Sequence, residues 1–236
     1  DLARTKYILF LNPDAELMSD SLGPACEYLE SADHHDVGVV GIQLLGEDGA
    51  VARSCARLPS PARLMAHSLG INKLRPFRSW GTTMEEWAHD RTRTVDQVIG
   101  AFFLTRRSVF NLLMGFDERF FVYYEEVDYS ARMKGLGYCS VYLAGARARH
   151  VGGGSSQNIK ARRLFYAVQS GLLYSFKHFR PAGRWVTVVG LLALEPIARL
   201  SFAVMARSKS DFANAASAYG MLYAALPQIL ARTRRP

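Results

Sequence analysis

The chain has few cysteines and lacks the short motifs that mark several common enzyme classes. Its three cysteines, Cys26, Cys55 and Cys139, lie far apart among 236 residues and form no CxxC pair. This spacing excludes a disulfide scaffold and a cysteine-based zinc site, and it is typical of a reducing compartment. The sequence also contains no Walker loop and no GxGxxG, GxSxG or HExxH motif. Kinase-type, Rossmann dehydrogenase, α/β-hydrolase and zincin functions therefore have no support.

Acidic residues are scarce in the last third of the chain. Residues 160–236 contain 12 Lys and Arg but only 2 Asp and Glu, whereas residues 1–159 contain 17 and 19. The net charge of +8 therefore comes entirely from the C-terminal part. A basic segment attached to a near-neutral domain predicts an acidic surface as its partner. Anionic membrane headgroups fit this role better than nucleic acid, which is not expected as a partner.

Apolar runs that alternate with helical patterns predict an α/β domain in the first two thirds of the chain. Strands are predicted at 6–11, 37–45, 96–105 and 138–143. Helices are predicted at 22–31, 108–115 and 125–134. The first strand is expected to be buried in a parallel sheet, because its apolar run is continuous. A turn at 47–49 is expected to form a hairpin with residues 50–55, and residues 59–93 are expected to be an irregular loop.

The C-terminal part is predicted to be helical. Residues 160–179 have apolar side chains at helical spacing, and residues 185–206 form a strongly apolar stretch. Glu195, Pro196 and Arg199 interrupt this stretch, and a spanning helix needs about 20 apolar residues without such charges. The pattern favours an interfacial helix pair or a re-entrant element, with a transmembrane span as the alternative.

Two potential metal ligands follow predicted strands. Asp14 comes directly after the first strand, in Asn12-Pro13-Asp14, and His150 follows the last one and precedes a glycine-rich run. Ligands of open α/β sheets bind beyond the carboxyl ends of strands, so Asp14 and His150 could share one divalent ion. The alternatives are a plain Asn-Pro-Asp turn and a structural histidine beside a hinge.

Three carboxylates lie within four residues, at Glu125, Glu126 and Asp128, after five bulky apolar or aromatic residues. Apolar surroundings raise the pKa of a carboxyl group and suit it to general-base catalysis. The alternative is an acidic first helical turn that the helix dipole stabilises.

The order of these segments resembles the family 2 glycosyltransferases with the GT-A fold. The resemblance is strongest to the rhamnosyltransferase-like branch, which builds bacterial surface polysaccharides, and it covers residues 5–156. It depends on the following segments, in this order: Leu11-Asn-Pro-Asp14, Asp48-Gly49, Gly100-Ala101, Gly115-Phe-Asp-Glu-Arg-Phe-Phe121, Glu125-Glu-Val-Asp128, Gly137-Tyr138, and His150 with its following glycines and serines.

The resemblance implies a role for each candidate residue. Asn12 and Asp14 stand where the family's DxD motif holds a divalent ion on the donor diphosphate, with Asp14 as the main ligand and His150 completing the site. Gly100 and Ala101 match the segment that lines the pocket for donor sugar and acceptor. Glu126 falls at the position of the catalytic base, and Glu125 and Asp128 would orient the base and the acceptor. Because the base position holds Glu in place of the commoner Asp, Glu125 is the alternative base. Mg²⁺ or Mn²⁺ is the expected ion.

The implied activity is a metal-dependent, inverting transfer of a sugar from dTDP-rhamnose or a UDP-sugar to a growing, lipid-linked surface polysaccharide. Residues 1–156 would form the C-terminal portion of the GT-A domain, because the family's first nucleotide-binding units have no counterpart before Asn12. Residues 157–236 would form a basic, amphipathic helical extension that holds the protein peripherally at the cytoplasmic face of the inner (plasma) membrane. Two other functions stay open: a metal-dependent phosphoesterase or nucleotidyltransferase, and a non-catalytic membrane-docking subunit.

Overall fold

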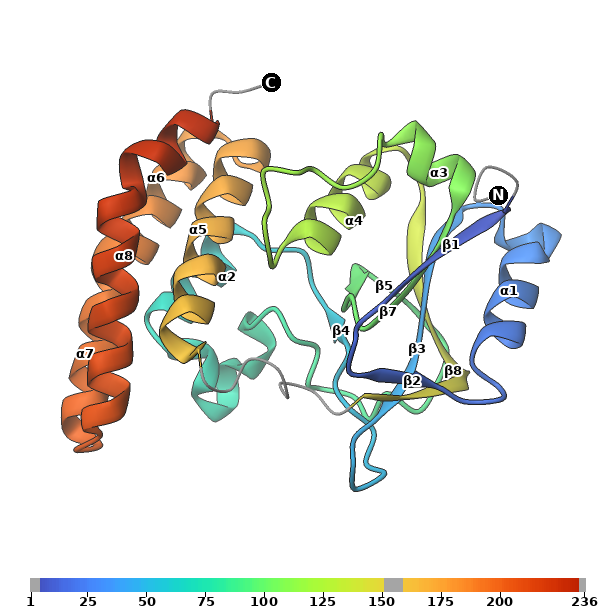
Figure 1. The fold of residues 1–236 in the computed structure, drawn as a ribbon, viewed down its shortest axis with the longest axis horizontal. Coiled ribbons are helices and arrows are strands. Elements are labelled where there is room, and N and C mark those ends of the chain that lie inside the picture. Colours follow the sequence, from blue (N-terminus) through green and yellow to red (C-terminus); the bar gives the residue numbers. More distant parts are fainter. Residues whose placement is uncertain (1–4, 151–158, 234–236) are drawn as a thin grey trace. The chain divides into compact units, whose positions relative to one another are not determined.

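The computed structural model describes residues 5–150 and 159–233, which form two compact units (Figure 1). The α/β unit comprises Asp1–Leu58, Thr82–Asp117 and Glu126–Ser155, and the helical unit comprises Pro59–Gly81, Glu118–Glu125 and Ser156–Pro236. The division at residue 156 expected from the sequence differs from these units in one respect. Residues 59–81 and 118–125 precede that boundary but pack with the C-terminal helices.

The α/β unit contains a six-stranded mixed sheet. Its order is β1-β7-β3-β8-β2, and β5 pairs with β8 beside this path. The strands are β1 (Tyr7–Leu11), β2 (Ala15–Leu17), β3 (Val37–Leu45), β5 (Arg93–Val95), β7 (Phe102–Arg106) and β8 (Cys139–His150). β3 and β8 are parallel, and the other pairs are antiparallel. Two short strands, β4 (Cys55–Ala56) and β6 (Gln97–Val98), form a separate antiparallel pair.

The first strand was predicted to be buried and parallel to its neighbour, and both predictions were wrong. β1 lies at one end of the strand order, pairs antiparallel with β7 and is only half-buried. A continuous apolar run is typical of a strand covered on both faces, but the run does not specify its partner. The hairpin expected at 47–55 forms only in part. The turn is present, with Gly49 at φ +76°, but the predicted second strand consists of a bridge between Leu45 and Val51 and the two residues of β4.

Helices cover both faces of the sheet because successive residues of β3 point to opposite sides. Val40 and Ile42 pack with Ala25 and Leu29 of α1 (Leu22–Glu30). Val39 lies in a different cluster, which also contains the side chains of α4 (Glu125–Gly135) and α3 (Arg107–Leu112). Figure 1 shows α1 on one side of the sheet and α3 and α4 on the other.

Residues 59–81, expected to be irregular, contain a short α-helix. α2 (Pro61–Ser68) begins after Ser60, whose Oγ accepts a hydrogen bond from the backbone N–H of Arg63 at 3.3 Å. A serine cap followed by proline at the first helical position is a good helix start, although α2 is too short for a clear apolar period. Two 3₁₀ turns follow, Ile71–Lys73 and Arg75–Trp80.

The remaining helices of the helical unit are α5 (Lys160–His178), α6 (Pro181–Val189), α7 (Glu195–Met205) and α8 (Lys209–Thr233). A π-helical segment, Gly190–Leu194, joins α6 to α7, so Pro181–Met205 is continuous helix and not the re-entrant element that was one expectation from the sequence. By length and apolar composition, this is the single described helix that could cross a membrane, a property that buried helices of soluble proteins share. It packs against α2 and α8, and α5 lies beside α8 (Figure 1).

Candidate functional site

Asp14 and His150 lie next to each other at one end of the sheet. The chain turns after β1, where the N–H of Ala15 donates to the carbonyl of Asn12 at 3.0 Å. It then enters β2, and Ala15 pairs with His150 at the end of β8. This register places His150 Nε2 at 3.3 Å from Asp14 Oδ1, with both side chains partly exposed. The structure thus brings together the two potential metal ligands of the sequence.

A backbone hydrogen bond adds the predicted donor-pocket segment to this end of the sheet. The N–H of Asn12 donates to the carbonyl of Ala101 at 3.2 Å, directly after the Leu11–Phe102 pair of β1 and β7. Ala101 is buried, and a Cβ atom at Gly100 would meet open space. The segment therefore combines a fixed backbone with free space beside Gly100, as a ligand-lining segment requires.

Asp14 and His150 line a cavity of about 420 Å³. Further charged side chains in its lining are Glu16 on β2, Arg149 on β8 and Glu47 in the turn after β3. None of these three was singled out from the sequence, where each looks like an ordinary surface charge. Only their positions in the sequence could have indicated that Glu16 and Arg149 belong to the site: Glu16 follows Asp14 by two residues, and Arg149 adjoins His150. Arg149 supplies the positive charge that a diphosphate beside Asp14 would need.

The Asp14–His150 pair is chemically suited to a divalent ion. A carboxylate oxygen and an imidazole nitrogen are ligands that Mn²⁺ and, for the oxygen, Mg²⁺ accept. Within residues 5–150 and 159–233, no group of three or more His, Cys, Asp and Glu side chains is arranged to hold a metal. Two protein ligands leave the other coordination positions to phosphate oxygens and water, which is how Mg²⁺ is usually bound beside a nucleotide. The glycine-rich run expected to hold a phosphate, 152–156, lies outside the described residues.

Glu125 and Glu126 begin α4. The two residues before them, Tyr123 and Tyr124, have φ of +65° and +72°, a conformation that bulky residues rarely adopt. Contacts with α5 hold these two tyrosines in this conformation. Arg163 Nε donates to the Tyr123 hydroxyl at 3.2 Å, and the ring of Tyr124 lies 5.5 Å from that of Tyr174. Strain of this kind is often found at functional sites.

Burial raises the pKa of the Glu125 carboxyl group above its ordinary value. Its Oε2 atom is buried and has no hydrogen-bond partner among the described residues. Such a carboxyl group takes up a proton more readily than an exposed one, which is the property that a general base needs near neutral pH. Glu125 therefore has the properties expected of the alternative base. Whether it or Glu126 acts as the base stays a prediction.

Asp128, which is predicted to help orient the base and the acceptor, is bound to an arginine of its own helix. Its side chain is fully buried and accepts a hydrogen bond from Arg132 Nε at 2.7 Å. Arg132 also donates to the carbonyls of Leu113 and Gly115, at 2.7 and 2.8 Å. Asp128 therefore fixes α4 to the loop after α3. An orienting role through α4 is compatible with this geometry and stays a prediction.

The mixed α/β unit, with a ligand-capable Asp–His pair at one end of its sheet, and the helical C-terminal part agree with the fold class expected from the sequence. No protein-family model matches the chain. It is 30% identical over 181 residues to an N-acetylglucosaminyl-diphospho-decaprenol L-rhamnosyltransferase of Mycobacterium tuberculosis, which covers 76% of this chain and 57% of that protein. It is 27% identical to the rhamnosyltransferase WbbL of Escherichia coli, over 71% of this chain and 61% of that protein.

The chain is therefore a homologue of rhamnosyltransferases, which confirms its resemblance to the rhamnosyltransferase-like branch of the family 2 glycosyltransferases. It spans somewhat more than half the length of these relatives. Among solved structures, a mannosyltransferase of Pyrobaculum calidifontis in complex with GDP-mannose and Mn²⁺ is a distant likeness. The TM-score is 0.44 and the identity 16%, over 97% of this chain and 58% of that one.

Proposed function

We propose that the chain acts as a glycosyltransferase: it binds the donor diphosphate through a divalent ion and transfers the sugar with inversion. The observation that carries this proposal is the Asp14–His150 pair, at 3.3 Å, next to the hydrogen bond between Asn12 and Ala101. Homology to rhamnosyltransferases supports dTDP-rhamnose as the first donor to test, before UDP-sugars.

Each residue of the site has a defined task in this reaction. Asp14 and His150 would hold Mg²⁺ or Mn²⁺, which neutralises the charge of the leaving diphosphate when it is bound. Gly100 would leave room for the donor sugar beside it, and the buried Ala101 would fix the backbone there. Glu126 accepts the proton of the acceptor hydroxyl. The hydroxyl oxygen then forms the new bond to the anomeric carbon on the face opposite the departing diphosphate, which inverts the configuration.

The proposed acceptor is a sugar linked through a diphosphate to a polyprenol. The relative in Mycobacterium tuberculosis is named for N-acetylglucosaminyl-diphospho-decaprenol, an acceptor of this kind. Such a lipid lies in the membrane, so the protein would work peripherally at the cytoplasmic face. The excess of 12 basic over 2 acidic residues in 160–236 would favour that surface.

Thermal unfolding with nucleotide sugars tests the donor site. We expect dTDP-rhamnose or a UDP-sugar to stabilise the chain in the presence of Mn²⁺, by about 2.7 kcal/mol at 100 times its Kd. The Asp14→Asn variant should lose this stabilisation, because it removes the charged metal ligand. Asp33→Asn, at an exposed position of the same unit, is the matched control and should retain it.

A stabilisation that needs neither the metal nor Asp14 would place the donor elsewhere and contradict the proposal. The absence of stabilisation by every donor would contradict donor binding by this chain. Release of phosphate or pyrophosphate without sugar transfer to N-acetylglucosaminyl-diphospho-polyprenol would replace the proposed function with that of a phosphoesterase or nucleotidyltransferase.

A further inference from the structure

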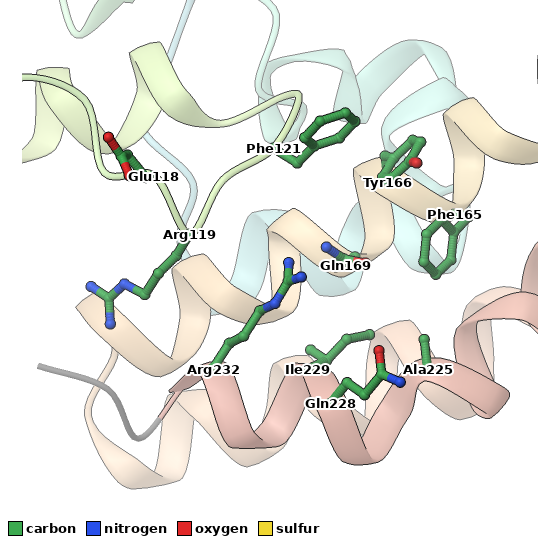
Figure 2. Close-up of a pocket in the computed structure, with 10 residues that line it drawn as sticks. All are labelled: Glu118, Arg119, Phe121, Phe165, Tyr166, Gln169, Ala225, Gln228, Ile229 and Arg232. Atoms are coloured by element: carbon green, nitrogen blue, oxygen red, sulfur yellow. The ribbon is translucent and has the colours of Figure 1, made fainter.

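A second cavity, of about 610 Å³, lies entirely within the helical unit. Its walls are Glu118, Arg119 and Phe121, one face of α5 and the last turns of α8 (Figure 2). None of its lining residues belongs to the site around Asp14, so the cavity needs an explanation of its own.

Gln169 is the most informative residue of this cavity. Its side chain lies on α5 and only 5% of the residue is exposed. No hydrogen bond joins its amide to any part of the chain that the structure describes. The amide atoms are not among the fully enclosed polar atoms, and Gln169 lines the cavity, so the unpaired amide is accessible from it. Gln169 is therefore positioned to bind a polar group that enters the cavity.

The cavity also contains positive charge. Arg232 lies in the last turn of α8 and makes no ion pair or hydrogen bond with the described residues. Figure 2 shows its guanidinium group extending from α8 toward α5, on the side where Gln169 lies. Arg119 adds a second guanidinium group to the lining, and Glu118 is the acidic residue there. Arginine binds phosphate oxygens in a bidentate manner, so this end of the cavity suits a phosphate or diphosphate.

The opposite end of the cavity is aromatic. Phe121 is 71% exposed, and its ring lies 5.3 Å from the ring of Tyr166, which in turn lies 5.0 Å from that of Phe165 (Figure 2). Exposed aromatic rings in a cavity offer apolar surface to a ligand. The ligand therefore combines an anionic group with an apolar portion and with hydroxyl or amide groups that Gln169 and Glu118 can bind.

We propose that this cavity binds the phosphorylated end of the acceptor lipid, a sugar joined through a diphosphate to an isoprenoid chain. Arg232 and the amide of Gln169 would bind the diphosphate, Glu118 the hydroxyl groups of the first sugar, and the aromatic rings the start of the isoprenoid chain. This inference rests on the proposed function, because it assigns a place to that function's acceptor.

Calorimetric titration of the chain tests the proposal with four compounds: N-acetylglucosaminyl-diphospho-farnesol, farnesyl diphosphate, inorganic diphosphate and farnesol. We expect affinity to fall in this order for the three compounds that contain diphosphate, and farnesol to bind most weakly. Arg232→Gln should weaken binding of the glycolipid about tenfold or more, because a charged hydrogen-bonding partner is lost. Arg162→Gln removes the same charge from an exposed position of α5 outside the cavity and should leave binding unchanged.

Gln169→Met separates ligand binding from a structural role. Because the amide has no partner in the described structure, this substitution should leave the urea midpoint unchanged or raise it, while glycolipid affinity falls severalfold. A lower midpoint with unchanged affinity would make Gln169 a structural residue and overturn the proposal. Equal binding of inorganic diphosphate and the glycolipid would show a simple anion site, and equal binding of farnesol would show an apolar groove; either result would also overturn it.

The kinetics of transfer distinguish this proposal from the proposed function. If sugar is transferred and Arg232→Gln raises the acceptor KM but not the donor KM, both are supported. Transfer with an unchanged acceptor KM would overturn the cavity assignment alone. Arginine-dependent binding of the glycolipid without any transfer would overturn the function alone.

Discussion

Glu126 and Asp128 are two residues apart on α4, and their side chains differ in burial. Asp128 is fully buried and bound to Arg132, whereas Glu126 is only partly buried in the first turn of the helix. Removing one partner of a buried ion pair leaves an uncompensated charge, so the Asp128–Arg132 pair helps to hold α4 in place. At the scale of single residues, Glu125 and Glu126 are therefore the two candidates for the base, and an orienting role of Asp128 stays a prediction.

We expect Glu126→Gln to abolish sugar transfer and to retain donor binding. The amide keeps the size of the side chain but cannot accept the proton of the acceptor hydroxyl. Transfer rate and the donor-induced thermal shift, measured on the same preparation, check this. Retained transfer in this variant would move the base to Glu125, whose pKa is raised by burial.

Asp128→Asn should destabilise the protein by about 3 kcal/mol, because it leaves the largely buried Arg132 guanidinium without its counter-charge. Urea unfolding of the variant measures this loss. The control is Lys6→Met, which breaks the exposed ion pair between Lys6 and Glu30, and its effect should be much smaller. Equal effects of the two substitutions would show that Asp128 does not have the structural role assigned to it.

At the scale of elements, the continuous helix Pro181–Met205 has two different sides. Its buried side includes Glu195, which accepts hydrogen bonds from Arg199 Nε at 2.7 Å and from Ser68 Oγ of α2 at 3.5 Å. Its exposed side is apolar, and Trp185 on it is 63% exposed. Other exposed apolar residues of this helix are Val186, Val189, Ile197, Phe202, Val204 and Met205. An ion pair directed into the protein together with an outward apolar side is typical of a helix that lies along a membrane surface.

Arg199→Met should lower the stability of the helical unit by about 2 kcal/mol, because it leaves the Glu195 carboxylate buried without its partner. Combining it with Glu195→Leu should restore most of this loss, since an apolar pair can replace an ion pair at little cost. Urea unfolding of both variants provides the measurement. If the double variant is less stable than Arg199→Met, the ion pair is not the reason for the loss.

At the scale of the whole molecule, the excess positive charge and the candidate metal ligands belong to different parts of the chain. The candidate metal ligands belong to the α/β unit, whereas residues 160–236 of the helical unit contain the excess of positive charge. Basic residues attract anionic headgroups, and exposed apolar side chains insert among the lipids beneath them. The helical unit therefore has both components of an interfacial membrane anchor.

The chain should bind vesicles of anionic phospholipid at low salt and should dissociate as salt is added, because the screening length falls to about 10 Å at 0.1 M. Neutral vesicles should bind it weakly. Trp185→Ser should reduce binding to anionic vesicles, because it removes exposed apolar surface. Co-sedimentation across a salt series measures all three. Binding that depends on neither salt nor anionic lipid would leave the segment 160–236 with a hydrophobic or structural role only.

Local patterns in the sequence were sufficient to predict those helices and strands whose apolar residues form a clear pattern. The continuous apolar run of β3 and the helical spacing of α1, α4 and α5 predicted these elements closely, because each pattern depends on neighbouring residues. Asp14 and His150 could likewise be named in advance, since each follows an apolar run that predicts a strand. The α-helix at Pro61–Ser68 was missed because it is too short to show a period.

Only the tertiary structure decided which of these segments meet. β1 pairs antiparallel with β7, about ninety residues away in the sequence, and no local pattern specifies such a partner. The pairing of β2 with β8 brings Asp14 within 3.3 Å of His150. The loop after α3 supplies carbonyl partners for Arg132, which also binds Asp128. The sequence by itself determined which residues have the chemistry for a metal and a base. Their distances and burial depend on contacts between distant segments, which are set when the whole core packs.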